Sequence, residues 1–166
     1  MQNDYIMRII AQFVQALLSI MRLRQAKEYK EAREVVRTTG RYLLRMDINL
    51  LLLYDHDQIL DHFRDLSNEL ETEKCVLSAD LFYELALIEE AEQRPAAALR
   101  LKNLCLHLYT IAIPLEEQFQ TAQYFEKVTR LAAEMANQPL SPKILDSLRS
   151  YQVFRQCPKK ADTPFN

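Results

Sequence analysis

Residues 3–24, NDYIMRIIAQFVQALLSIMRLR, form the first long apolar stretch of the chain, and the way polar residues interrupt it decides how the rest is interpreted. The interruptions recur at steps of four, three, four and three: Arg8, Gln12, Gln15, Ser19 and Arg22. This spacing places them along one side of an α-helix. A membrane-spanning helix needs about twenty largely uninterrupted apolar residues, and a secretory signal begins with basic residues, which MQNDY lacks. The pattern therefore predicts a soluble helix of a cytoplasmic protein, with no membrane partner.

The apolar arc of this predicted helix is wider than one neighbouring helix would cover. We therefore expect it to contact two elements of its own chain, or a second copy of the chain. The residues that we expect at such a self-association surface are Ile6, Ile10, Phe13 and Leu17. A homodimer formed through this face is a hypothesis at this stage.

Composition narrows the class of fold. The 166 residues include a single glycine, Gly40, while 49% are hydrophobic and 27% are charged. Phosphate-binding loops, dinucleotide fingerprints and the nucleophile elbow of hydrolases all need glycine, so none of them can be built here. The net charge of -2 gives no general attraction to nucleic acid, and no recognition-helix signature stands out. The sequence predicts one all-α domain.

Short breaks divide the chain into about seven predicted helices. A domain over residues 1–155 is expected to hold them, followed by a flexible tail over 156–166, which is rich in proline and poor in apolar residues. The predicted helices after the first are 26–46, 58–70, 76–93, 94–113, 115–137 and 141–154. Short connections favour antiparallel neighbours, as in a helical bundle or a helical-repeat array.

One spacing favours the array. Tyr29 and Ala32 lie three residues apart at the start of a predicted helix, and Pro95 and Ala98 do the same 66 residues later. This offset is close to twice the period of about 34 residues that characterises tetratricopeptide repeats. The pattern resembles such repeats over roughly the first two-thirds of the chain, although their consensus glycines are missing. It implies antiparallel helical hairpins in a TPR-like array.

A second resemblance rests on DYIMRII at 4–10, KEYKEA at 27–32 and LFYELAL at 81–87. The chain resembles an uncharacterised family of short bacterial TPR-like helical proteins that begin with D-Y-I-x-R-x-I. The resemblance implies cytosolic helical hairpins. It supplies no catalytic residues, because that family has no assigned activity.

Two rows of like charge are the sharpest local features. Basic residues follow one another at steps of four in the second predicted helix, and acidic residues do so in the third: Arg33, Arg37, Arg41 and Arg45; Asp57, Asp61, Asp65 and Glu69. One interpretation is that the two helices run antiparallel and pair the rows, with Arg45 near Asp57 and Arg33 near Glu69. The alternative is that the basic row faces a groove and receives an anionic partner.

The segment YDHDQILDHFRD, residues 54–65, contains the residue types of a metal site, but none of the ordered ligand spacings. We therefore interpret its aspartates as helix caps and a solvated face, and expect neither a metal nor a cofactor. His107 lies in an apolar helix, and we expect it to be a hydrogen-bonded core residue. The cysteines, Cys75, Cys105 and Cys157, are too widely spaced for a zinc or redox motif.

The function that these observations favour is a non-enzymatic module that binds a protein or peptide through an inter-hairpin groove. The candidate groove residues are Arg33, Arg37, Arg41, Tyr42 and Tyr83. The alternative is a sensor that holds a small anionic ligand or peptide in the same groove. An enzyme with a site assembled from distant residues ranks third.

Overall fold

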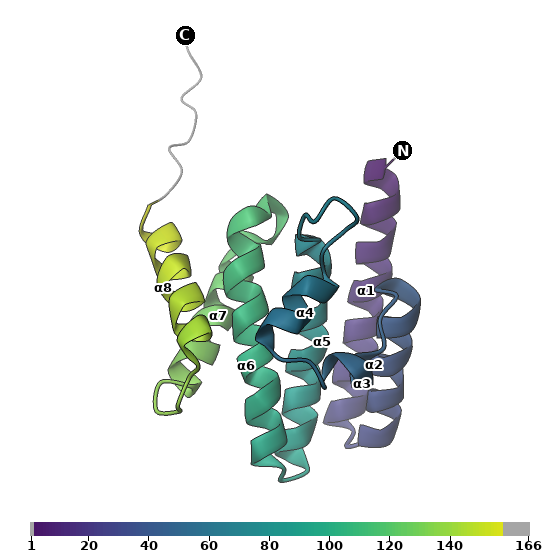
Figure 1. Ribbon diagram of the computed structural model, residues 1–166. Helices are drawn as coiled ribbons and strands as arrows, with labels where there is room; N and C mark the ends of the chain where they lie inside the picture. The colour runs from purple at the N-terminus through teal and green to yellow at the C-terminus, as the bar shows by residue number, and fades with distance from the viewer. Residues whose placement is uncertain (1, 158–166) are drawn as a thin grey trace.

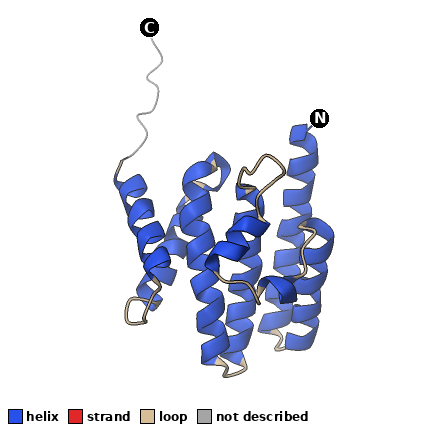
Figure 2. Ribbon diagram, in the orientation of Figure 1, coloured by secondary structure: helices blue, strands red, loops and turns tan. Residues whose placement is uncertain are grey.

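A computed structural model describes residues 2–157, and within that range every regular element is helical (Figures 1 and 2). The helices are α1 (Gln2–Gln25), α2 (Tyr29–Leu43), α3 (Ile48–Leu51), α4 (His56–His62), α5 (Thr72–Ala91), α6 (Pro95–Ala112), α7 (Ala122–Glu134) and α8 (Pro142–Gln156). Two 3-10 turns, Ile113–Leu115 and Glu117–Phe119, connect α6 to α7. The predicted all-α fold is confirmed.

The long helices form a row, with α5 near its centre (Figure 1). α1 and α2 pair with each other and both contact α5, whereas α6 contacts α5 on one side and α7 and α8 on the other. Most side chains of α5 and α6 are buried, because these two helices have neighbours on several sides. The short helices α3 and α4 connect the first hairpin to the second and pack against α2 and α6, respectively.

The turns of the two hairpins share one backbone conformation. Lys27 in the first and Gln93 in the second both adopt a left-handed conformation, with φ of 62° and 60°. Ala32 and Ala98 follow each turn at the same distance, and both are buried where the helices approach. In each turn the next N–H group bonds a carbonyl five residues back at 2.8 Å: Glu28 to Leu23, and Arg94 to Glu89. This agrees with the 66-residue offset in the sequence, whereas the TPR-like arrangement stays a prediction.

The segment between the hairpins differs from the sequence prediction. The helix predicted over 58–70 begins two residues earlier, at His56, behind a capping box formed by Asp55 and Gln58, and ends at His62. It stops there because the Asp65 carboxylate accepts N–H groups from Ser67 at 2.7 Å and Glu69 at 3.0 Å, which folds the chain into a loop. The additional helix α3 brings the number of α-helices in the described chain to eight, where about seven were expected.

Gly40 marks a close approach of α3 to α2. A Cβ atom at this position would lie 2.7 Å from Cγ1 of Ile48 and 2.9 Å from its Cδ1, which is nearer than two carbon atoms approach. The glycine therefore allows the buried Ile48 to seat the start of α3 directly on the α2 backbone.

The C-terminal boundary and the cysteines are simple to place. α8 ends at Gln156, and residues 158–166 of the predicted tail lie outside the described residues. Cys75 of α5 and Cys105 of α6 are buried, Cys157 is exposed, and none of the three forms a disulfide.

α1 is the least enclosed of the long helices. By length and composition alone its residues 4–25 could cross a membrane, with a mean hydropathy of 1.5, and 11% of an 18-residue window within them is buried. Phe13 and Ile20 nevertheless lie in the core, at 1% and 0% exposure. One side of α1 is therefore part of the folded domain, and the opposite side is open.

Candidate functional site

The structure divides the predicted arginine row into two parts. Arg33 donates to the carboxylates of Glu89 and Glu92 at the end of α5, and Arg37 donates to Glu34 at 2.7 Å. Burial alone would lower the pKa of Arg33, but the hydrogen bonds and negative charges of the two glutamates raise it above its ordinary value. Arg33 therefore connects α2 to the end of α5, whereas Arg37 pairs within α2, and both arginines are already occupied.

The predicted pairing of the basic row with the acidic row is wrong. Asp57 forms its ion pair with Lys143 of α8, and Asp61 pairs with Arg64 at 3.4 Å. Asp65 caps its own loop. The pairing fails because α4 ends at His62, so the acidic residues after it do not continue along a helix face.

Arg41, Tyr42 and Arg45 lie at the far end of α2 and are exposed. The Tyr42 side chain is 76% exposed. Within residues 2–157, neither Arg41 nor Arg45 forms an ion pair. Tyr83, the remaining candidate, lies elsewhere, beneath the ammonium group of Lys127 at 5.3 Å from the ring centre. The structure therefore does not gather the five candidate groove residues into one groove.

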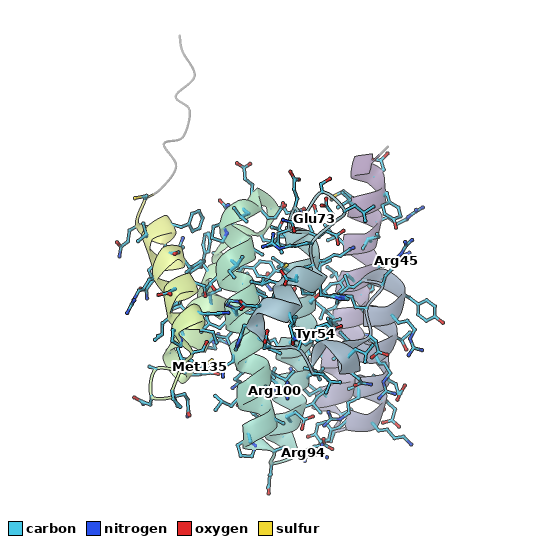
Figure 3. The ribbon with its side chains drawn as sticks, in the orientation of Figure 1. Arg45, Tyr54, Glu73, Arg94, Arg100 and Met135 are labelled. Carbon is cyan, nitrogen blue, oxygen red and sulfur yellow. The ribbon has the colours of Figure 1, made fainter. Side chains whose placement is uncertain are left out.

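Two adjoining cavities surround Arg45, and together we call them the Arg45 site. The first, of about 270 Å³, lies between α1 and α2, and the second, of about 400 Å³, extends to the start of α5. Both are lined by Tyr5, Ile9, Leu43 and Arg45. The first adds Arg8, Gln12 and Tyr42, and the second adds the apolar residues Ile6, Ile10, Leu44 and Leu77 beside Glu71, Glu73 and Lys74. Figure 3 shows Arg45 on the α1–α2 side of the molecule and Glu73 on the α5 side.

The backbone places Arg45 in a restrained conformation. Its φ of 53° is in the left-handed region, which costs a residue with a side chain about 1 kcal/mol. The N–H group of the next residue, Met46, donates to the carbonyl of Gly40 at 2.9 Å and holds this turn closed. This is the left-handed conformation with which many helices end. The guanidinium group of Arg8 lies 5.7 Å from the centre of the Tyr5 ring, on the other wall of the site.

This arrangement suits recognition of an anion attached to apolar groups. In the first cavity, whose lining holds no carboxylate, Arg8 and Arg45 carry two positive charges and the tyrosines provide aromatic walls. The second cavity adds an aliphatic floor beside Glu71, Glu73 and Lys74. Arginine and tyrosine are the residues most often found at the centres of interfaces. Sequence reasoning named Tyr42 as a candidate groove residue and Arg45 only as a member of the basic row, and it missed Tyr5 and Arg8. These two residues meet Arg45 only because α1 and α2 lie side by side.

Another cavity, of about 590 Å³, is lined by Met135 and by Pro95, which follows Arg94, and so lies away from Arg45 (Figure 3). Its one buried cation, Lys102, bridges Glu90 of α5 and Glu134 of α7, the latter at 2.7 Å. Burial alone would lower the pKa of Lys102, but the two glutamates raise it above its ordinary value. Because its charges neutralise one another, this cavity is a weaker candidate for binding an anion.

A pair of histidines, the half-buried His56 and the buried His107, joins α4, α6 and α8. The rings of His56 and His107 meet edge to face, with their centres 5.1 Å apart. Nδ1 of His107 lies 3.5 Å from the Ser147 hydroxyl of α8, whereas Nε2 of both rings and Oδ1 of Asn103 are buried without a hydrogen-bond partner in the protein. Burial, and after it the charge of the nearby His56, lowers the pKa of His107 to about 4. The expected core position of His107 is confirmed, but its hydrogen bonding is incomplete.

A second buried polar cluster attaches α7. The Asp80 carboxylate of α5 accepts the hydroxyl groups of Tyr109 at 2.5 Å and Tyr124 at 2.7 Å, and the Lys127 ammonium group at 3.0 Å. Burial, followed by the negative charge of Asp80, raises the pKa of both tyrosines. Because every member has a partner, the cluster is a structural contact of α7 with the α5–α6 hairpin.

The expected self-association residues lie on the inner half of α1. Phe13 is in the core, and Ile6, Ile10 and Leu17 are half-buried. A different set of apolar residues faces outward. These five exposed residues, which we call the α1 seam, are Met7, Ala11, Val14, Leu18 and Met21.

No group of three or more His, Cys, Asp or Glu side chains that could hold a metal ion occurs in the part of the chain that the structure describes. Comparison with protein families, curated proteins and solved structures finds none that matches this chain.

Proposed function

We propose that the protein is a non-enzymatic interaction module that binds an acidic segment of another protein at the Arg45 site. The observation that carries this proposal is the contrast within the basic row. Arg33 and Arg37 are paired with glutamates, whereas Arg45, and Arg8 opposite it, have no carboxylate partner among residues 2–157 and line a hollow surface. A peptide carboxylate would supply the missing partner through charge-assisted hydrogen bonds.

The aromatic and apolar surroundings support a peptide over a free inorganic anion. Tyr5 and Tyr42 remain half or more exposed, at 50% and 76%; both line the first cavity, and Tyr5 also lines the second, which has an aliphatic floor. An acidic segment with one or two apolar side chains would cover both surfaces. A sensor for a small anionic ligand is the second candidate, because the first cavity alone, of about 270 Å³, is close to the size of small-ligand pockets.

The test uses Arg45→Gly. Glycine removes the guanidinium group and also suits the left-handed backbone, so we expect folding stability to be kept or raised by about 1 kcal/mol. Binding of a labelled acidic peptide, with prolines that prevent it from forming a helix, should weaken about tenfold in a fluorescence anisotropy titration.

Lys27→Gly is the matched control. Lys27 is also an exposed cation with a positive φ, of 62°, but it lies in the turn at the other end of the α1–α2 hairpin. We expect this variant to bind the peptide as the parent protein does. If the two substitutions weaken peptide binding equally, the loss reflects the net charge of the protein and not a contact at the Arg45 site, which contradicts the proposal. Absence of binding by the parent protein would contradict it as well.

A further inference from the structure

The α1 seam has the spacing of a coiled-coil surface. Its residues, from Met7 to Met21, follow one another at steps of four, three, four and three, which are the steps between successive core positions of a heptad repeat. They cover an arc of about 80° on the helix, much narrower than the apolar face that binds a helix to a domain core. Val14 and Leu18 at its centre are 46% and 42% exposed. A narrow stripe of this kind fits one helix laid alongside it.

The charged residues beside the α1 seam indicate the charge of the partner. Arg8 and Arg22 both follow a seam residue directly and so flank the stripe on one side. Neither forms an ion pair within the described chain, whereas Arg24, on the inner side of α1, is bound to Glu84 at 3.0 Å. Residues at these flanking positions of coiled coils choose the partner through interhelical ion pairs. Two unpaired arginines therefore select a helix with acidic flanks.

The same charges argue against a second copy of this chain. If two α1 helices met antiparallel through their seams, Arg8 of one copy would lie near Arg22 of the other, and like charges would be opposed. A parallel arrangement would place both arginines opposite uncharged residues. The narrowness of the stripe argues against a bilayer, because helices that lie on membranes present a broad apolar face.

We propose that the α1 seam docks an amphipathic α-helix with acidic flanks, supplied by another protein. The proposal rests on the proposed function, because Arg8 belongs both to the flank of the α1 seam and to the wall of the Arg45 site. A helix running along α1 would reach that site with one of its ends. The partner is thus identified by two features, a heptad of apolar residues and carboxylates beside it.

The experiment uses two synthetic peptides of about three heptads with the same isoleucine and leucine core positions. One carries glutamate at the flanking positions and the other carries lysine, so that each repels itself. We expect fluorescence anisotropy to show that the acidic peptide binds at least about tenfold more tightly than the basic peptide, and that salt weakens its binding. Arg8→Glu combined with Arg22→Glu should reverse the preference between the two peptides.

Val14→Glu combined with Leu18→Glu should abolish binding of the acidic peptide. Its matched control is Leu115→Glu combined with Val153→Glu, which places the same groups at two exposed apolar positions (64% and 61%) away from α1 and should bind normally. Circular dichroism melting of each variant checks that it is folded. The arginine reversal gives a second measurement that does not depend on changes to the apolar seam.

Several outcomes would overturn the docked helix. These are absence of binding to the acidic peptide, binding that survives Val14→Glu with Leu18→Glu, a dimer in sedimentation that the same substitutions dissociate, or binding to anionic vesicles in place of the peptide. If the helical peptide fails while the proline-containing acidic peptide still binds at Arg45, the docked helix falls and the proposed function stands. If neither peptide binds, both the docked helix and the proposed function are wrong.

Discussion

Gly40 shows how much one residue can determine. The composition alone showed one consequence of the low glycine content: a chain with a single glycine cannot form glycine-rich loops. The composition did not show the structural role of Gly40, because that role depends on Ile48, whose Cγ1 would lie 2.7 Å from an added Cβ. That contact depends on α3, a helix of four residues, which is too short to be predicted from apolar periodicity in the sequence.

Gly40→Ala should therefore destabilise the protein, although alanine favours helices more than glycine does by about 1 kcal/mol. Overpacking against the buried Ile48 costs more than this gain, and we expect a net loss of about 1–2 kcal/mol in urea unfolding. In a double-mutant cycle, Ile48→Ala should cancel much of the loss, because it removes the clashing carbons. Equal losses from Gly40→Ala in both backgrounds would show that the close contact is not the cause.

At the scale of elements, the sequence predicted the long helices better than the connections between them. Apolar periodicity and prolines located α1, α2, α5, α6 and α8, because these signals are local. The helix predicted over 115–137 starts too early, since two 3-10 turns follow Pro114 and α7 begins only at Ala122, behind the Thr121 cap. The end of α4 depends on side chain to backbone hydrogen bonds of Asp65, which compete with helix continuation and look in sequence like one more acidic position. The same error produced the predicted pairing of the acidic and basic rows.

The attachment of α7 should depend on the charge of Asp80. This carboxylate is 3% exposed and accepts two tyrosine hydroxyls and the Lys127 ammonium group. Asp80→Asn leaves the ammonium group without its counter-ion, and we expect a loss of about 3 kcal/mol in the free energy of unfolding. Asp80→Leu combined with Lys127→Leu should cost less than Asp80→Leu alone. The opposite order in denaturant titrations would mean that the ion pair does not govern this contact.

At the scale of the whole molecule, the candidate site could be predicted only in part. Tyr42 was a candidate groove residue from the sequence, and Arg45 was named only as part of the basic row. The pairing of Arg33 with Glu89 and Glu92 was not predicted, since those residues lie 56 and 59 positions away in the chain. Tyr5 and Arg8 join the site only because α1 and α2 run antiparallel. Which cations remain unpaired is therefore a property of the fold.

The histidine pair between α4, α6 and α8 should make the whole fold sensitive to acid. The pKa of His107 is lowered from 6.5 to about 4, and that of His56 is lowered too. Around His56, burial is the main cause, Asp55 opposes it, and Lys143 and Arg100 add to it. The unfolded chain therefore takes up protons below pH 6.5 that the folded chain refuses, so stability falls as pH falls.

For His107 the loss should reach about 3 kcal/mol between pH 6.5 and pH 4. Urea unfolding at a series of pH values measures it. His107→Gln should flatten this part of the profile, whereas His62→Gln, at an exposed position, should leave it unchanged. A profile that keeps its slope in His107→Gln would assign the acid sensitivity to other groups.

The three thiols allow local opening of the folded protein to be measured by chemical modification. Cys157 stands in solvent, while Cys75 and Cys105 lie on the facing sides of the central hairpin with their pKa values raised by burial, that of Cys75 to about 12. An alkylating reagent would thus modify one sulfur immediately and the other two only during excursions that part α5 from its neighbours. Mass spectrometry would measure the delay between the first modification and the later two. This delay reports how often the central hairpin opens, without any introduced label.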